Sequence, residues 1–266
     1  MTAQPEAETM GNRAPVCCYV YGIIPAETSL PEGLTGTEGR EVSLVEHGDL
    51  AAVVSEIRAD RPLGTRDDLL AHERVVESVA ADTTMVPLRF GAVVTTPAAV
   101  VEEMLAPHHD WFADVLAELD GLTEFTVLGT YVRDTVLREV LMEDPEAMRL
   151  RESLRDLPEE AGYYDRVRLG ELIVKALEAK REVDNAALAD ALAPHAVAVA
   201  PRHAAGEDTA ADVAFLVAED EQPAFEEALD QLGHEWAGRI RLRMIGPLAP
   251  YDFVPEAPES APPEEG

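Results

Sequence analysis

The residue types that bind metals in proteins occur in this chain without the spacing that a metal site needs. His72-Glu73 begins like the His-Glu-x-x-His motif of zinc enzymes, but Val76 stands where the second histidine would be. Cys17 and Cys18 are adjacent, and neither has a Cys-x-x-Cys partner. The sequence therefore predicts no metal site and two reduced thiols, as in a cytoplasmic protein.

Motifs for phosphate binding and nucleophilic catalysis are missing as well. Gly33, Gly36 and Gly39 recur in one loop, but no Lys-Ser or Lys-Thr pair follows them, and the chain has no Gly-x-Ser-x-Gly elbow. Acidic pairs such as Glu102-Glu103 fall on predicted helix surfaces, whereas a general acid and base need burial. We therefore expect no cofactor and no enzymatic activity.

One pattern of basic residues does stand out. Arg239, Arg241 and Arg243 alternate with three apolar residues, so a strand would place the three guanidiniums on one face of a sheet and the apolar side chains on the other. The arginines either pair with carboxylates of this chain or bind an acidic partner. The abundance of acidic residues favours pairing within the chain.

The charge balance excludes two classes of partner. The 266 residues include 52 acidic and 21 basic side chains, for a formal net charge of -31. A field this negative opposes the binding of nucleic acids and of anionic membrane surfaces. With 47% apolar residues the chain can build a core, yet it shows neither a signal peptide nor an apolar run of about 20 residues. We expect a soluble cytoplasmic protein that binds no nucleic acid and no lipid membrane.

The elements that would position these residues fall into two α+β domains, of which residues 16–121 form the first. A start signal at Thr65 predicts a helix with one apolar stripe that includes Leu69, Leu70 and Val76. Pro107 is expected to interrupt a second helix that begins at Pro97 and ends before Gly121. Strands are expected over residues 16–24, 41–46, 50–57 and 85–94. We interpret this half as a variant α/β sandwich.

Residues 122–246 form the second domain, with the element order β, α, β, β, α, β. Strands are expected over residues 123–133, 195–201, 212–219 and 239–245, and helices over residues 145–157, 164–193 and 225–236. Two interleaved βαβ units of this order predict a ferredoxin-like plait, an antiparallel sheet with helices on one face.

Three further segments are set apart by composition. Residues 1–15 and the acidic, Pro/Glu-rich residues 255–266 are expected to be disordered, because neither can pack a core. Residues 247–254 are apolar and not helical, and include Leu248, Tyr251 and Phe253. We expect this segment to pack back across the other domain as a clasp.

Four segments of the chain resemble the gas vesicle proteins F and L. They are residues 19–23 (YVYGI), 72–76 (HERVV), 86–91 (VPLRFG) and 246–254 (GPLAPYDFV). Their order and spacing span nearly the whole folded chain. Departures from the family pattern are small, with Ala92 where the family often has Thr, and Ala249 and Asp252 where it often has Pro and Ser.

The resemblance implies a minor component or assembly factor of gas vesicles without catalytic residues. Its partner would be the small, very hydrophobic GvpA-like shell protein, which it would keep from aggregating before the shell is nucleated, and it could bind other gas vesicle accessory proteins. A charge of -31 suits this role, because it makes complexes repel their copies.

We expect the apolar surface that captures the shell protein on the first domain, residues 16–121, although the candidate partner-binding residues come from both halves of the chain. Tyr19, Tyr21, Arg89 and Phe90 lie on two predicted strands of the first sheet, but alternation along a strand favours a core position for Phe90 and for one of the two tyrosines. Arg89 points away from Phe90 and could bond a client carboxylate or a neighbouring acid. In the second half the candidates are Arg239, Arg241, Arg243 and Tyr251.

A second function, of a different kind, is also compatible with the predicted fold. Paired ferredoxin-like domains often bind small molecules, so a ligand-binding regulatory protein is the alternative. A rise in melting temperature on addition of a ligand would favour it.

Overall fold

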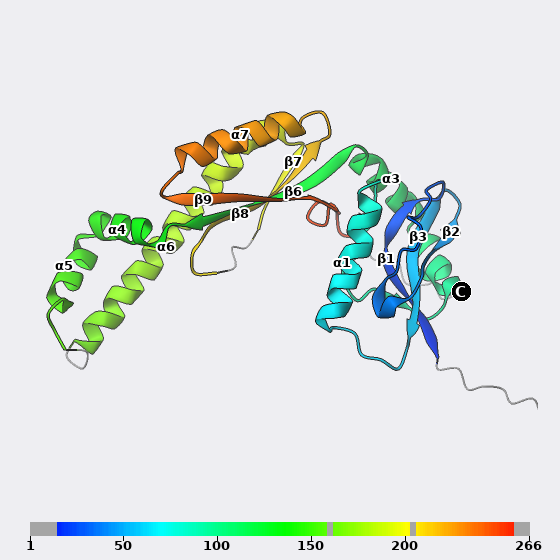
Figure 1. The fold of residues 1–266 in the computed structure, drawn as a ribbon, viewed down its shortest axis with the longest axis horizontal. Helices are drawn as coiled ribbons and strands as arrows, with labels where there is room; N and C mark the ends of the chain where they lie inside the picture. Colours follow the sequence, from blue (N-terminus) through cyan, green and yellow to red (C-terminus); the bar gives the residue numbers. More distant parts are fainter. Residues whose placement is uncertain (1–14, 159–161, 203–205, 258–266) are drawn as a thin grey trace, which may run out of the picture. The chain divides into compact units, whose positions relative to one another are not determined.

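The chain divides between Asp120 and Gly121 in the computed structural model, which describes residues 15–158, 162–202 and 206–257 (Figure 1). Of the described residues, the first unit holds 15–120 and 254–257, and the second is Gly121–Phe253. The tails predicted over residues 1–15 and 255–266 lie outside the described residues, except for Pro15 and residues 255–257. Both contain an antiparallel sheet with helices, which confirms the expected mixture of α and β structure. In the described residues, no helix is long and apolar enough to cross a membrane.

The sheet of the first unit is built around strand β1. The order is β2-β3-β1-β4, with β5 also paired to β1, and all pairs are antiparallel. The strands are β1 (Val16–Pro25), β2 (Val42–His47), β3 (Leu50–Arg58), β4 (Val86–Pro87) and β5 (Val93–Val94).

The single strand expected over residues 85–94 is wrong, because the chain leaves the sheet between β4 and β5. Pro87 has no N–H to donate to a ladder. Gly91 then adopts a left-handed φ of 97°, which turns the chain before it returns at Val93.

Helix α1 (Arg66–Ala80) begins at a capping box, in which the Thr65 hydroxyl accepts from the Asp68 N–H and the Asp68 carboxylate accepts from the Thr65 N–H. The cap draws Asp68 inward, so the buried face begins at Asp68 and continues through His72 and Val76. Leu69 and Leu70 therefore do not share the face of Val76 as the predicted stripe required, since both are exposed while Val76 is buried.

The interruption expected at Pro107 is confirmed. The chain forms a short helix α2 (Pro97–Ala99), a π-helical stretch η2 (Val100–Leu105) and helix α3 (His109–Leu119), with Pro107 between the last two. Both α1 and α3 contact β1. Residues 18–24 of β1 are buried without a break, as in a strand covered on both faces.

The second unit has a four-stranded antiparallel sheet of order β7-β8-β6-β9. Its core combines Phe125, Phe215 and Phe225 with Leu188 and Leu192 from the long helix α6. The strands are β6 (Leu122–Tyr131), β7 (Ala198–Pro201), β8 (Thr209–Ala218) and β9 (Ile240–Leu248), and the helices packed on this core are α6 (Tyr163–Leu192) and α7 (Gln222–Glu235).

Three helices of this unit form a helical arm, defined here as α4 (Arg133–Glu143), α5 (Pro145–Leu154) and the first half of α6 (Figure 1). Helix α4 is not predicted from the sequence. No side chain caps its N-terminus at Val132, so the usual start signal is missing. Helix α5 does carry such a signal, since the Asp144 carboxylate accepts from the N–H groups of Glu146 and Ala147.

Candidate interaction surfaces

The two tyrosines of β1 lie inside the first unit. Tyr19 and Tyr21 are both 0% exposed, and their ring centroids are 4.9 Å apart. The expectation that only one of them is in the core is wrong, because residues two apart on a strand face the same side. Here that side packs against His72 of α1.

Each tyrosine hydroxyl is held by partners within the unit. The Tyr19 hydroxyl lies 2.9 Å from His72 Nδ1 and accepts from the Gly91 N–H at 3.1 Å. Burial raises the pKa of Tyr19 to about 12 and lowers the pKa of His72 to about 4, so His72 is neutral at pH 7. The pair is therefore part of the core and is not available to a partner.

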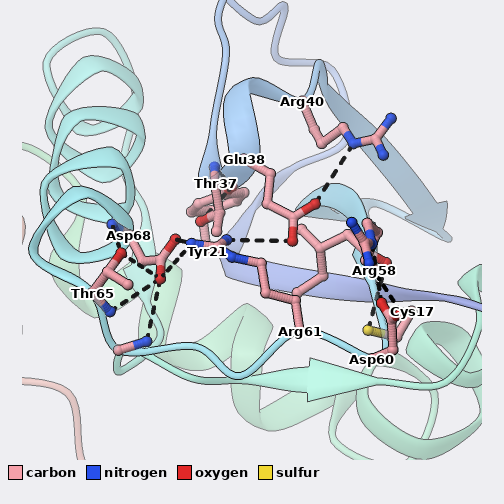
Figure 2. A network of polar contacts seen from close by, with 12 residues as sticks. Cys17, Tyr21, Thr37, Glu38, Arg40, Arg58, Asp60, Arg61, Thr65 and Asp68 are labelled. Atoms are coloured by element: carbon pink, nitrogen blue, oxygen red, sulfur yellow. Dashed lines mark hydrogen bonds and ion pairs between the residues drawn. The ribbon is translucent and has the colours of Figure 1, made fainter.

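Tyr21 anchors the loop that connects β1 to β2. Its hydroxyl accepts from the Thr37 N–H at 2.8 Å (Figure 2). The same hydroxyl donates to Ser55 Oγ at 3.1 Å. Gly36 packs against this hydroxyl so closely that an added Cβ would lie 1.9 Å from it. The loop can adopt this path only with glycine at that position.

The same loop is tied to α1 by an arginine bridge. Arg61 pairs with Glu38 at 3.3 Å and with Asp68 at 2.9 Å (Figure 2). Burial alone would raise the pKa of Asp68, but hydrogen bonds from Thr65, Arg61 and Gly64 outweigh it and lower that pKa. Glu38 has a left-handed φ of 60°. These groups satisfy one another, so this network holds the fold.

Arg89 and Phe90 lie between β4 and β5. Phe90 is half-buried, with its ring 6.0 Å from Tyr19 and 5.7 Å from His72. Arg89 is exposed, and within the described residues it forms no ion pair. Of the four candidate residues in the first unit, Arg89 is therefore the one that is exposed to solvent.

The three arginines near β9 do not share one environment. Arg239 precedes the strand, so the alternation does not apply to it, and it turns toward the helices. Its guanidinium bonds both carboxylate oxygens of Asp184 at 2.8 and 2.9 Å, and it also pairs with Glu139. These bonds raise the pKa of Arg239 further above its usual range. Pairing within the chain is thus confirmed for Arg239, while its place on the same face as the other two arginines is wrong.

Arg241 and Arg243 do alternate as expected. Leu242 and Met244 pack against the core, while both arginines are exposed. In the part of the chain that the structure describes, neither forms an ion pair. They are thus the two basic side chains of this strand that could meet an acidic partner.

A buried cluster of charged side chains lies around Glu124 of β6. The sequence does not predict this cluster. Glu124 of β6 is 2% exposed and accepts from the Asp252 N–H at 3.0 Å. Burial is the main cause that raises its pKa to about 7. Arg202 pairs with Asp252 at 3.2 Å, lies 3.5 Å from Asp212 and donates to Thr126. Spacing could not reveal this cluster, because its members come from distant segments.

Asp252 belongs to the apolar segment 247–254. Pro247 and Leu248 extend β9, Ala249 and Pro250 are buried, and Tyr251 is 36% exposed. The contact from Asp252 to Glu124 ties the segment to its own unit. Its packing across the other domain stays a prediction.

The exposed apolar side chains gather on the helical arm and α6. The first unit exposes Val16, Leu69, Leu70 and Val93. The arm, the connection between α5 and α6, and the rest of α6 expose Met142, Met148, Leu157, Tyr163, Tyr164, Val167, Val174 and Val183. The apolar surface expected on the first unit is therefore small, and the larger one lies on the second. No group of three or more potential metal ligands occurs among the described residues.

Comparisons with known proteins give matches that extend over both units of the chain. The family described as gas vesicle synthesis protein GvpL/GvpF matches residues 17–255. Gas vesicle protein F of Streptomyces sp. is 33% identical over 243 residues, which cover 89% of this chain and 98% of that protein. Gas vesicle protein L of the same organism is 29% identical over 255 residues, which cover 91% and 94%.

A solved structure agrees with these matches. The crystal structure of gas vesicle protein GvpF from Anabaena sp. has a TM-score of 0.71 and 26% identity to this chain, and the alignment covers 91% of this chain and 97% of that one. The resemblance read from four short segments is thereby confirmed along both units. The chain belongs to the gas vesicle synthesis protein GvpL/GvpF family.

Proposed function

We propose that this chain is a gas vesicle accessory protein that binds the hydrophobic, GvpA-like shell protein, keeps it from aggregating and supports nucleation of the shell. Family membership gives the association with gas vesicles. In this proposal the protein works in the cytoplasm at the vesicle, and it uses neither a cofactor nor catalysis.

The observation that carries the proposal is the set of exposed apolar side chains on the helical arm and α6 of a strongly acidic protein. Tyr163 and Tyr164 are 66% and 85% exposed on a chain with a formal charge of -31. Exposed apolar patches mark interaction sites. A large net charge keeps the loaded protein soluble, since like-charged complexes repel one another.

Several smaller sites would complete the contact with a client. Arg89 is placed to bond a carboxylate, and Phe90 is half-buried beside it. In the second unit, Arg241, Arg243 and Tyr251 are exposed. We assign them to the edges of the contact, where single charges tune specificity more than affinity.

The fold proposed for the second unit is the ferredoxin-like plait. Its strand order, β7-β8-β6-β9, is the order of that plait with α4 and α5 added before α6. On this view the helical arm is an addition to a standard scaffold, and additions of this kind often carry function.

Co-expression tests the proposed function directly. The shell protein is produced alone, with this chain, and with an unrelated acidic protein of similar size, and its soluble fraction is measured after centrifugation. We expect a soluble fraction only in the presence of this chain. An equal soluble fraction with the unrelated acidic protein would contradict the proposal, because charge alone would then explain the effect.

A further inference from the structure

A groove runs along the helical arm, within the second unit. It encloses a cavity of about 710 Å³ between α4 and α6. Its apolar lining comes from Val136 and Leu137 of α4, Ile173, Val174 and Leu177 of α6, and Tyr131 of β6, and charged side chains complete the walls. A groove of this size and composition has the character of a binding site.

The groove continues into an exposed apolar stripe on α6. Tyr163, Val167, Gly170 and Val174 follow one another at i, i+4, i+7 and i+11, so they share one face of the helix. A Cβ added at Gly170 would meet nothing within 4 Å, which leaves an open notch midway along the stripe. From Tyr163 to Leu177 the stripe is about 21 Å long, or about four helical turns.

The shape of this surface selects the kind of partner. Ridges of side chains on one helix pack into the grooves of others, and a notch at a glycine lets a neighbouring backbone approach closely. An amphipathic helix of about four turns would fill the groove with residues at i, i+3, i+4 and i+7.

The charges at the rim select the polar face of that helix. Glu178, Glu207 and Asp208 line the groove. The two lining arginines are engaged by this chain: Arg133 pairs with Asp208 at 3.3 Å, and Arg181 donates to the Thr209 carbonyl at 2.8 Å. Glu178 is exposed and, among the described residues, forms no ion pair. Arg133 also lies 4.0 Å from Glu207. Three carboxylates against two guanidiniums leave the lining with one net negative charge, and the charge of -31 on the whole chain adds attraction for a basic partner.

We propose that the groove between α4 and α6 binds an amphipathic helix with a basic polar face, supplied by another protein. A second copy of this chain is disfavoured as the occupant, because two chains of charge -31 repel each other. The inference goes beyond the proposed function, since the groove can hold such a helix whether or not its owner is the shell protein.

The test uses the full chain and two synthetic peptides of about 15 residues. One peptide combines a leucine face with lysines, and the other combines the same leucine face with glutamates. Binding is measured by fluorescence anisotropy with the wild type, with Val174→Glu and with Val183→Glu. Val183 is the matched control, because it lies on the same helix but away from the groove, and at 68% exposure it is more accessible than Val174 at 55%.

We expect the lysine peptide to bind, with affinity reduced about tenfold or more by Val174→Glu and unchanged by Val183→Glu. Gly170→Trp, which fills the notch, should weaken binding as well. Equal weakening by both valine variants, or equal binding of the glutamate peptide, would overturn the proposal. It would also fail if the free chain were a dimer that Val174→Glu dissociates, because the groove would then hold a second copy.

The peptide-binding test and the co-expression test can fail independently of each other. The chain could keep the shell protein soluble while the lysine peptide fails to bind, which would reject only the groove. If the peptide binds as expected while co-expression gives no soluble shell protein, only the proposed function is rejected.

Discussion

The guanidinium of Arg239, just before β9, and the carboxylate of Asp184, in the second half of α6, form two parallel hydrogen bonds at 2.8 and 2.9 Å. The Tyr131 hydroxyl donates to the same carboxylate at 2.6 Å. Bidentate pairs of this kind are among the strongest polar contacts in proteins. This pair therefore fastens the long helix to the sheet beside the helical arm.

Removing Arg239 should destabilise the protein. Arg239→Ala leaves the buried Asp184 carboxylate without its cation, so we expect the free energy of unfolding to fall by about 2–3 kcal/mol in urea denaturation. Arg241→Ala is the matched control, because Arg241 lies two residues further along the chain, on β9, and is exposed, and it should change stability by less than about 0.5 kcal/mol. Equal effects of the two variants would refute the role given to the pair.

The hydroxyl of Tyr21 should matter to the stability of the first unit. Tyr21→Phe leaves the buried N–H of Thr37 without its acceptor, which should cost about 1–3 kcal/mol. Tyr164→Phe removes a hydroxyl at a position that is 85% exposed and should cost little. Thermal unfolding followed by circular dichroism compares the two, and a loss at Tyr164 as large as that at Tyr21 would contradict the structure.

Burial of His72 should make the protein sensitive to acid. Its pKa is about 4 in the folded state against an ordinary value of 6.5, so the unfolded state binds the proton more tightly. The free energy of unfolding should therefore fall as pH drops from about 6.5 to 4. His72→Gln should flatten this part of the profile, whereas replacing the exposed His234 with Gln should not. A profile unchanged by His72→Gln would show that the ring titrates normally.

Glu124 should have the opposite dependence on pH. Its pKa is raised from 4.5 to about 7, so the folded state holds the proton more tightly than the unfolded one. The contribution of Glu124 to stability is present below about pH 4.5 and is lost as pH rises toward 7. Relative to the wild type, Glu124→Gln should gain up to about 3 kcal/mol between pH 5 and pH 8. Urea denaturation at both values measures this, with exposed Glu235→Gln as the control, and a constant difference would contradict the prediction.

The parts of the fold that sequence alone predicts are those set by neighbours along the chain. β1 and β3 follow from runs of apolar residues, α1 from its cap at Thr65, and the break before α3 from Pro107. Helix α4 is not predicted because no side chain caps its start. The four family segments lie at fixed places along the chain, so membership of the GvpL/GvpF family could also be read without a structure.

Tertiary structure alone decided which charged and aromatic side chains are available to a partner. Tyr19 and Tyr21 read as surface candidates, but α1 covers both. Arg239 reads as part of an arginine face, but Asp184, 55 residues earlier in the chain, binds it. Glu124 meets Asp252 across 128 residues. Burial and pairing depend on contacts between segments far apart in the sequence, and local residue patterns do not record which segments meet.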